Sequence, residues 1–432
     1  MILPLRNRLA IGIVAVCCGF LLLQIASAGT ILKASCPCGY RLNNIYAGGV
    51  FANFRTVCAA SGLLLGFAER AVPKTGYIVY VGTYTRQQDS GIYAFRFDPA
   101  SGKAISIGLV AEAANPSFLA IHPNGRFLYA VNEVSTFAGR NSGSVTAYAV
   151  DPLTGRLNLL NTVSSQGASP CHLTVDRSGR FLFVANYGGG SVAVLPVKKD
   201  GSLGAASGFV QHEGSSVNSR RQQGPHAHEI VLSPDNRFAL VPDLGLDQVR
   251  VYRTNLEAGT LVLNTPGICR LEPGSGPRHL AFHPDGRFAY VINELRSTVT
   301  VFAYDPKNGI LRELQTAPTL PNDFTGTNAC AEIAVHRSGR FLYGSNRGHD
   351  TIAVYGIDPG KGTLTSMGQV ATQGKNPRSF AIDPTGNYLL AANQDTGNVV
   401  LFRIDRQTGR LAPTGDVLEV PLPACVTFLE AR

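Results

Sequence analysis

The segment His122-Pro-Asn-Gly-Arg-Phe-Leu-Tyr-Ala-Val-Asn132 occurs six times along the chain in closely related form. The other copies begin at Asp176, Ser233, His283, His336 and Asp383, so successive copies are 47 to 57 residues apart. Each copy contains a tight turn followed by an apolar run, which is the pattern of a β-hairpin. A repeat of this length indicates a propeller, a solenoid or another array of similar units.

One unit contains the pattern of four short strands. A Pro-led apolar run (116–121) precedes the turn, and a second run (127–132) follows it. An alternating run (144–150) and a shorter run (157–163) complete the unit. Four short strands joined by tight turns form a meander, which is the blade of a β-propeller. Because no helical period occurs and the chain has no Trp, we expect an all-β fold that is not of the WD40 type.

The two ends of the repeat region complement each other. Residues 77–85, 91–98 and 105–111 have the pattern of the second, third and fourth strands of a blade without its first strand. Residues 423–429 resemble a first strand with no strands after it. We therefore predict that residues 76–432 form a seven-bladed β-propeller with one blade shared between the N- and C-terminal parts. Such a ring closes without a free sheet edge.

The charge distribution does not predict a nucleic-acid partner. The formal net charge is +9, but residues 1–75 contain seven basic residues and one acidic residue, which leaves only about +3 for the rest of the chain. A polyphosphate-binding surface needs a larger excess of basic residues than this.

The N-terminus has the features of an export signal. Arg6 and Arg8 precede an uncharged run from Leu9 to Ala28 that ends in Ala-Ser-Ala. This pattern predicts a signal peptide at residues 1–28 and a periplasmic or extracellular protein. An uncleaved membrane anchor is the alternative, and only then would the protein contact a membrane. Residues 29–75 have no assigned domain, and a translation start near Val50 is a further possibility.

The positions that can carry chemistry are the strand ends at one face of the ring. In a propeller the first strand lines the central channel, so first-strand starts and second-strand ends from all blades lie at the same channel mouth. The Asn or Asp that ends each second strand recurs in six units, and we expect it to bind turn amides. Residues that stand where other blades carry small or apolar residues are better site candidates, since the architecture does not require them. They are His226, His228, Glu229, Arg278, His279, Glu294 and Arg347.

This mixed cluster is suited to acid–base chemistry on an anion. A His can transfer a proton near neutral pH, a Glu can orient it, and two Arg can hold a carboxylate or phosphate. His172 and Arg378, at other first-strand starts, are further candidates for substrate binding together with His226 and His279.

A metal site is the alternative for the same residues. His226 and His228 could share a metal with His279 or Glu294, but Arg278 and Arg347 would repel a cation. The four cysteines of the repeat region, at 171, 269, 330 and 425, lack metal-ligand spacing and do not suggest a disulfide scaffold. We therefore predict no metal and no cofactor.

Five motifs in this region resemble the seven-bladed propeller lactonase family. They are Tyr80-Val-Gly-Thr-Tyr84, Gly224-Pro-His-Ala-His228, Gly276-Pro-Arg-His279, Asn293-Glu-Leu295 and Ser345-Asn-Arg347. The family includes the bacterial propeller type of 6-phosphogluconolactonase and the fungal carboxymuconate lactonising enzymes. The resemblance extends over residues 76–432. It implies a metal-independent site in which His228, Arg278, Glu294 and Arg347 act on an anionic small molecule.

Three functions are consistent with these observations. The first is hydrolysis of an anionic sugar or aldonic lactone, with His228 as general base, Glu294 orienting it, Arg278 stabilising the oxyanion and Arg347 holding the substrate's anionic group. The second is a muconate-type cyclase that uses the same arginines to bind carboxylates. The third is a non-enzymatic exported propeller that binds partners or glycans. The sequence makes no prediction of oligomeric state.

Overall fold

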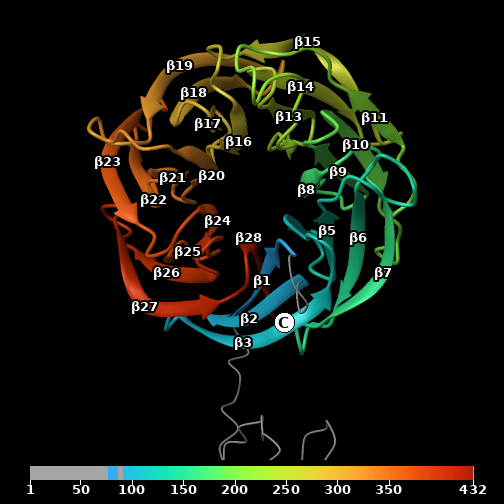
Figure 1. The fold of residues 1–432 in the computed structure, drawn as a ribbon, viewed down its shortest axis with the longest axis horizontal. Coiled ribbons are helices and arrows are strands. Elements are labelled where there is room, and N and C mark those ends of the chain that lie inside the picture. The colour runs from blue at the N-terminus through green and yellow to red at the C-terminus, as the bar shows by residue number, and fades with distance from the viewer. Residues whose placement is uncertain (1–75, 86–90, 432) are drawn as a thin grey trace, which may run out of the picture. The chain divides into compact units, whose positions relative to one another are not determined.

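The computed structural model describes residues 76–85 and 91–431. In these residues every regular element is a β-strand, and the strands form seven four-stranded antiparallel sheets. The sheets surround a central axis as propeller blades, each with one innermost strand (Figure 1). The prediction of an all-β, seven-bladed propeller is therefore confirmed. The predictions for residues 1–75, including the export signal, lie outside the described residues. No helix in the described ranges is long and apolar enough to cross a membrane.

Six blades follow chain order from their innermost to their outermost strand. The first three are β4 (Leu119–Ile121), β5 (Phe127–Asn132), β6 (Ser144–Val150), β7 (Leu157–Ser164); β8 (Pro170–Val175), β9 (Phe181–Asn186), β10 (Ser191–Pro196), β11 (Gly208–Gln211); and β12 (Val231–Leu232), β13 (Phe238–Asp243), β14 (Gln248–Asn255), β15 (Thr260–Arg270). The next three are β16 (Pro277–Phe282), β17 (Phe288–Asn293), β18 (Thr298–Asp305), β19 (Ile310–Pro318); β20 (Ala329–Val335), β21 (Phe341–Arg347), β22 (Thr351–Ile357), β23 (Leu364–Ala371); and β24 (Pro377–Ile382), β25 (Tyr388–Asn393), β26 (Asn398–Ile404), β27 (Leu411–Glu419).

The seventh blade joins the two ends of the repeat region. Its strands are β28 (Pro423–Glu430), β1 (Tyr77–Thr83), β2 (Gly91–Asp98) and β3 (Lys103–Glu112), in that order across the sheet. β28 and β1 are antiparallel, with Tyr77 opposite Glu430 and Val81 opposite Val426. The predicted shared blade is confirmed, and the ring is closed by main-chain hydrogen bonds between strands far apart in the sequence.

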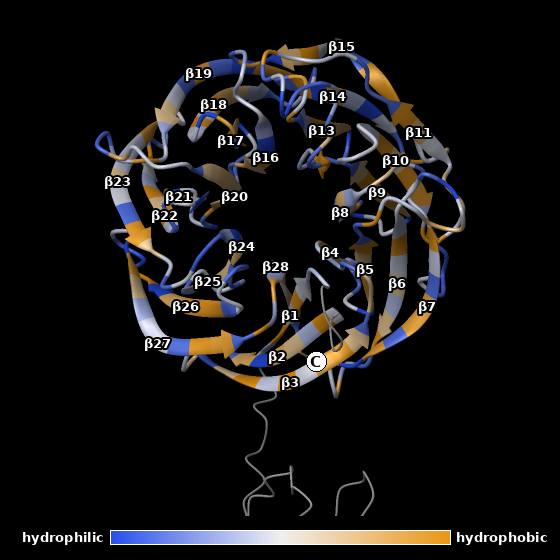
Figure 2. Ribbon diagram, in the orientation of Figure 1, coloured by the Kyte–Doolittle hydropathy of each residue, from blue (hydrophilic) through white to orange (hydrophobic). Residues whose placement is uncertain are grey.

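The recurring hairpin forms because its residues satisfy both the turn and the core. Gly125 in the first turn has φ of +68°, a left-handed conformation that glycine adopts without a Cβ clash. The copy between β12 and β13 has Asn236 at this position, with φ of +61°, and Asn is among the few other residues that tolerate it. The apolar run after the turn is completely buried in β5, β9 and β17. Apolar residues occur on strands all around the ring (Figure 2).

The apolar core lies between neighbouring blades. One core cluster, for example, combines Phe238 and Leu240 of β13 with Leu280 of β16 and Val291 of β17. Buried tyrosines add a repeated polar contact. Tyr129, Tyr290 and Tyr343 each donate a hydrogen bond from their hydroxyl group to a glycine carbonyl of the next blade, at 2.7–3.1 Å. Each blade is therefore stabilised by its neighbours, which fixes the positions of the strand ends around the axis.

Asp243 accepts a hydrogen bond from the turn amide of Gly245, as expected for the residue that ends the second strand, but three of the recurring Asn residues have a different role. The side-chain amide groups of Asn186, Asn346 and Asn393 donate to the main-chain carbonyls of Ser165, Thr319 and Thr372, at 3.0–3.1 Å. These carbonyls directly follow the outermost strand of the preceding blade. The Asn side chain therefore joins two blades rather than binding turn amides of its own hairpin.

Five innermost strands have an irregularity near their start, where most of the site residues occur. The pairing register shifts near the start of β8, β16, β20, β24 and β28, and the extra residues include Cys171, Arg278 and Arg378. Such bulges redirect a side chain and are common next to active sites. Another innermost strand, β12, is only two residues long. His226, His228 and Glu229 therefore lie in the connection before β12, and not at the start of a regular strand as predicted.

Candidate active site

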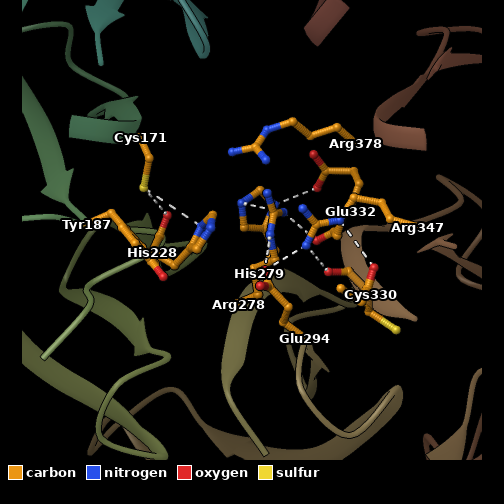
Figure 3. Close-up of polar contacts among 12 residues, drawn as sticks. Cys171, Tyr187, His228, Arg278, His279, Glu294, Cys330, Glu332, Arg347 and Arg378 are labelled. Atoms are coloured by element: carbon orange, nitrogen blue, oxygen red, sulfur yellow. Dashed lines mark hydrogen bonds and ion pairs between the residues drawn. The ribbon is translucent and has the colours of Figure 1, made fainter. Parts of the chain in front are cut away.

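The structure brings most of the predicted site residues together at one end of the ring. Arg278 and His279 belong to β16, Glu294 follows β17, Arg347 ends β21, and His228 precedes β12. Because successive strands of a blade are antiparallel, these first-strand starts and second-strand ends share a face. Figure 3 shows their side chains pointing toward a common centre from three blades.

Glu294 lies at the centre of a cluster of guanidinium groups. Its Oε2 is 3.1 Å from Nε of Arg278 and 2.8 Å from Nη2 of Arg347, and its Oε1 is 2.6 Å from Nη2 of Arg221. Burial raises the pKa of this carboxyl, but the three positive charges outweigh burial and lower its pKa to about 2. Glu294 is therefore ionised at neutral pH, and it fixes the arginines. No contact joins it to His228, so the predicted role in orienting that histidine has no support in the described contacts.

Arg278 is held rigidly in a buried position. Its Nη1 donates to the carbonyl oxygen of Ala331 at 2.6 Å and to Nε2 of His279 at 3.2 Å. Its side chain is only 3% exposed. The bulge in β16 allows both Arg278 and His279 to reach the site in succession. This guanidinium is a preorganised positive group, which is the requirement for stabilising charge that develops in a reaction.

His228 is buried beside this positive charge. Its ring lies 5.3 Å from that of His279 and 5.3 Å from that of Tyr187. Burial, followed by the nearby charges of Arg278 and other cations, lowers the pKa of His228 well below its usual 6.5. The imidazole is consequently neutral at physiological pH and can accept a proton. Its Nδ1 lies 3.8 Å from the thiol of Cys171, and burial raises the pKa of that thiol, which stays protonated.

His279 has both ring nitrogens engaged. Nε2 accepts the hydrogen bond from Arg278, and Nδ1 donates to Oε1 of Glu332 at 2.9 Å. These two partners fix the tautomer, as a carboxylate and a cation do when they bind opposite sides of an imidazole. Burial lowers the pKa of His279, although Glu332 opposes this shift. His279 therefore positions Arg278 rather than presenting a free nitrogen.

His172 and Glu229 form a second buried pair next to this group. Nε2 of His172 is 3.4 Å from Oε1 of Glu229, and its ring lies 5.5 Å from that of His279. Burial lowers the pKa of His172 and raises that of Glu229, so burial favours the neutral form of each group. The other Glu229 oxygen accepts from the main-chain amide of Leu280. The hydrogen bond between Glu229 and Leu280 links the connection before β12 to β16.

His226, which was predicted to bind substrate, instead contacts Tyr187. Its ring stacks on Tyr187 at 4.4 Å, and its Nδ1 donates to the Tyr187 carbonyl at 2.9 Å.

Arg347 was predicted to hold the substrate's anion. It donates from Nε and Nη2 to the carbonyls of Ala329 and Cys330 in addition to its pair with Glu294. Burial lowers its pKa to about 10, which leaves it charged at neutral pH.

Arg378 approaches the same centre from β24. Its Nη2 donates to the hydroxyl group of Tyr84 at 2.6 Å, and that hydroxyl donates to Glu133 at 2.7 Å. The Arg378 guanidinium also lies 4.9 Å from the centre of the Tyr84 ring. This chain of contacts connects the shared blade to the site.

Arg221 and Glu332 contact the site residues but were not among the residues predicted from the sequence, and Arg221 is the more instructive case. It lies in the connection between β11 and β12 (212–230), outside every recurring strand, so a search of strand ends could not find it. One signal was available. The interval between the copies at Asp176 and Ser233 is 57 residues, the longest of the five, which indicates an insertion in this blade.

The donor set does not form a metal site in the described part of the chain. No group of three or more His, Cys, Asp or Glu side chains there has an arrangement that could hold a metal ion. In the alternative metal site, His226 and His228 would share one ion, but His226 stacks on Tyr187 and His228 lies beside His279.

Comparison with known proteins identifies the same fold and a recurring activity. The chain is 40% identical over 355 residues to a 6-phosphogluconolactonase of Bacillus subtilis, covering 82% of this chain and 99% of the relative. It is 35% identical to a 6-phosphogluconolactonase of Formosa agariphila, covering 77% and 94%. A solved structure, the periplasmic gluconolactonase PpgL of Pseudomonas aeruginosa, has 38% identity and a TM-score of 0.78, covering 83% and 100%.

The family model described as "Lactonase, 7-bladed beta-propeller" matches residues 78–428. This range begins in β1 and ends in β28, so it spans all seven blades, including the shared one. The chain thus belongs to the seven-bladed β-propeller lactonase family.

Proposed function

We propose that the protein hydrolyses the ester bond of an aldonic or sugar lactone that carries an anionic group. The observation that carries this proposal is a neutral, buried His228 beside Arg278, whose guanidinium is fixed by Glu294, His279 and the Ala331 carbonyl. A base and a preorganised cation at one site are the two groups that lactone hydrolysis needs. The names of the similar proteins support the same reaction class.

The reaction follows from these positions. His228 accepts a proton from water, and the resulting hydroxide attacks the lactone carbonyl carbon. Arg278 stabilises the oxyanion that forms on the carbonyl oxygen. The bond between this carbon and the ring oxygen then breaks, and the ring oxygen takes up the proton, giving a hydroxy acid. Glu294 contributes by holding Arg278 and Arg347 in place, which differs from the orienting role that the sequence suggested.

The test is Arg278→Ala measured with lactones in a pH-stat, where hydrolysis releases acid. We expect kcat/KM to fall by roughly a hundredfold or more, the scale of removing one oxyanion donor. The matched control is Arg126→Ala, an exposed turn residue in the first copy of the repeat, which should retain activity. Equal losses in the two variants would show a folding effect. Consumption of a muconate without acid release would favour the cyclase instead.

We also propose that the protein is exported, with residues 1–28 as the signal peptide. Arg6, Arg8 and the run from Leu9 to Ala28 support this location, and so does the similarity to a periplasmic gluconolactonase. We expect cell fractionation to recover the protein outside the cytoplasm, with an N-terminus at Gly29 or within residues 57–75. Recovery of a full-length chain from the cytosol would contradict the proposal.

A further inference from the structure

Residues 212–230 form an unusually long connection between blades. It has 19 residues, whereas the equivalent connections at 165–169 and 372–376 have five each. The longer segment is well anchored. The main-chain amide of Gln222 donates to the Asn218 carbonyl at 2.8 Å, and its side-chain amide donates to the Leu244 carbonyl at 2.8 Å. Gln222 is completely buried, so the segment holds its neighbour Arg221 in a defined place.

Arg221 extends from this segment to the catalytic group. Its Nη2 is 2.6 Å from Oε1 of Glu294 and donates to the Tyr187 hydroxyl at 3.3 Å. The three arginines around Glu294 differ strongly in exposure. The side chain of Arg278 is 3% exposed, that of Arg347 is 14% exposed, and that of Arg221 is 40% exposed. They form a series from the buried part of the site to its rim.

The charges in this group are unequal. One carboxylate, Glu294, contacts three guanidinium groups, which leaves two positive charges in excess. The Glu332 carboxylate, bonded to His279, reduces the excess but does not cancel it. A positive surplus at a partly buried site favours an anionic ligand, because screening by water is weaker there.

We propose that Arg221 is the specificity-determining residue of this site and binds the anionic group at the end of the substrate remote from the lactone. This inference rests on the proposed function. When the lactone carbonyl lies at buried Arg278, the far end of the substrate lies toward the rim, where Arg221 is the exposed guanidinium. The anion it recognises is a phosphate monoester or a carboxylate, both of which an arginine binds with charge-assisted hydrogen bonds.

The experiment compares three lactones that differ only at the remote end. They are 6-phosphoglucono-1,5-lactone, a glucarolactone with a terminal carboxylate, and uncharged glucono-1,5-lactone. In Arg221→Met we expect kcat/KM for at least one anionic lactone to fall by about ten- to a hundredfold, the effect of one charged hydrogen bond, mainly through KM. The value for the uncharged lactone should change by less than about threefold. Arg221→Lys should recover part of the loss.

The matched control is Arg220→Met, which removes the same charge from the adjacent, exposed residue. It should leave all three kcat/KM values unchanged. Loss confined to the phosphorylated lactone identifies phosphate as the anion, and loss confined to the glucarolactone identifies carboxylate. Equal losses for all three lactones in Arg221→Met, or no loss, would overturn the inference.

Failure of the proposed function gives a different result. If the wild-type protein hydrolyses none of the three lactones, the hydrolase proposal is wrong for this substrate range. Calorimetric binding of 6-phosphogluconate, glucarate and gluconate then tests Arg221 without turnover. The inference is supported if Arg221→Met binds 6-phosphogluconate or glucarate more weakly than the wild type does and binds gluconate equally well. Unchanged binding of both contradicts it.

Discussion

At the scale of single residues, the site depends on one carboxylate that neutralises part of a cationic cluster. Glu294 is buried, which on its own would make ionisation unfavourable. The three guanidinium groups reverse this effect and lower the pKa to about 2. Glu294 and the three arginines therefore depend on one another, because removing the carboxylate leaves buried positive charges without a partner.

We expect Glu294→Gln to lower the free energy of unfolding by about 3–5 kcal/mol at pH 7, the scale of breaking a buried ion pair. The folded-state pKa lies below the usual 4.5, so the stabilisation is complete above about pH 5 and is lost as the pH falls toward 2. The difference between wild type and variant should shrink over that range. Denaturant unfolding at pH 7 and pH 3 measures it.

The control for this prediction is Glu419→Gln, which changes an exposed glutamate on the outermost strand β27. Its effect should be within about 0.5 kcal/mol, as is usual for surface substitutions. A stability difference for Glu294→Gln that is the same at both pH values would show that the carboxylate charge does not stabilise the cluster.

At the scale of strands and their connections, one blade has an acidic residue at the position of the recurring Asn. β13 ends in Asp243 instead of Asn, and His212 occupies the position after β11 where other blades have Ser165 or Thr319. Nδ1 of His212 is 2.6 Å from Asp243 Oδ2, and the Tyr252 hydroxyl is 2.9 Å from its Nε2. Asp243 Oδ1 also accepts from the main-chain amide of His226. The pair thus anchors both ends of the connection that carries Arg221.

We expect His212→Ala to destabilise the protein by about 3 kcal/mol, because it leaves a fully buried carboxylate without its side-chain partner. KM for an anionic lactone should also rise, since the segment with Arg221 loses an anchor. Thermal unfolding and steady-state kinetics measure the two effects. Ser165→Ala at the equivalent position keeps the carbonyl that binds Asn186, and should have a much smaller effect on both. Similar losses in the two variants would contradict this role.

At the scale of the whole molecule, stability depends on closing the ring. Deletion of residues 424–432 removes most of β28, which is the innermost strand of the shared blade and pairs with β1. We expect the truncated protein to lose its cooperative thermal transition and to aggregate, because β1 then becomes an exposed edge and the adjacent cores lose Cys425 and Val426. Circular dichroism during heating tests this. A soluble variant with a wild-type melting temperature would contradict it.

The recurring sequence determined the architecture. Turn residues such as Gly125 and alternating apolar runs act locally, so each hairpin could be predicted from its own residues, and the incomplete units at the two ends specified the shared blade. Strand polarity then placed Arg278, Glu294 and Arg347 at one face. The first strand of the blade with His228 was predicted to start near His226, whereas β12 contains only Val231 and Leu232, because pairing there does not follow from the local pattern.

Only the tertiary structure decided how the site residues are used. Whether Glu294 meets His228 or three arginines depends on side-chain directions from several blades, which a bulge in β16 alters without any sequence signal. The long interval between two copies indicated an insertion, but the contact of Arg221 could not be predicted from it, since this residue lies in a connection with no repeat and reaches Glu294 across 73 positions of the chain. The conformational preferences of turns and strands are local and recur along the sequence, so they can be predicted from it. Contacts between distant, non-repeating side chains form only once the ring has closed.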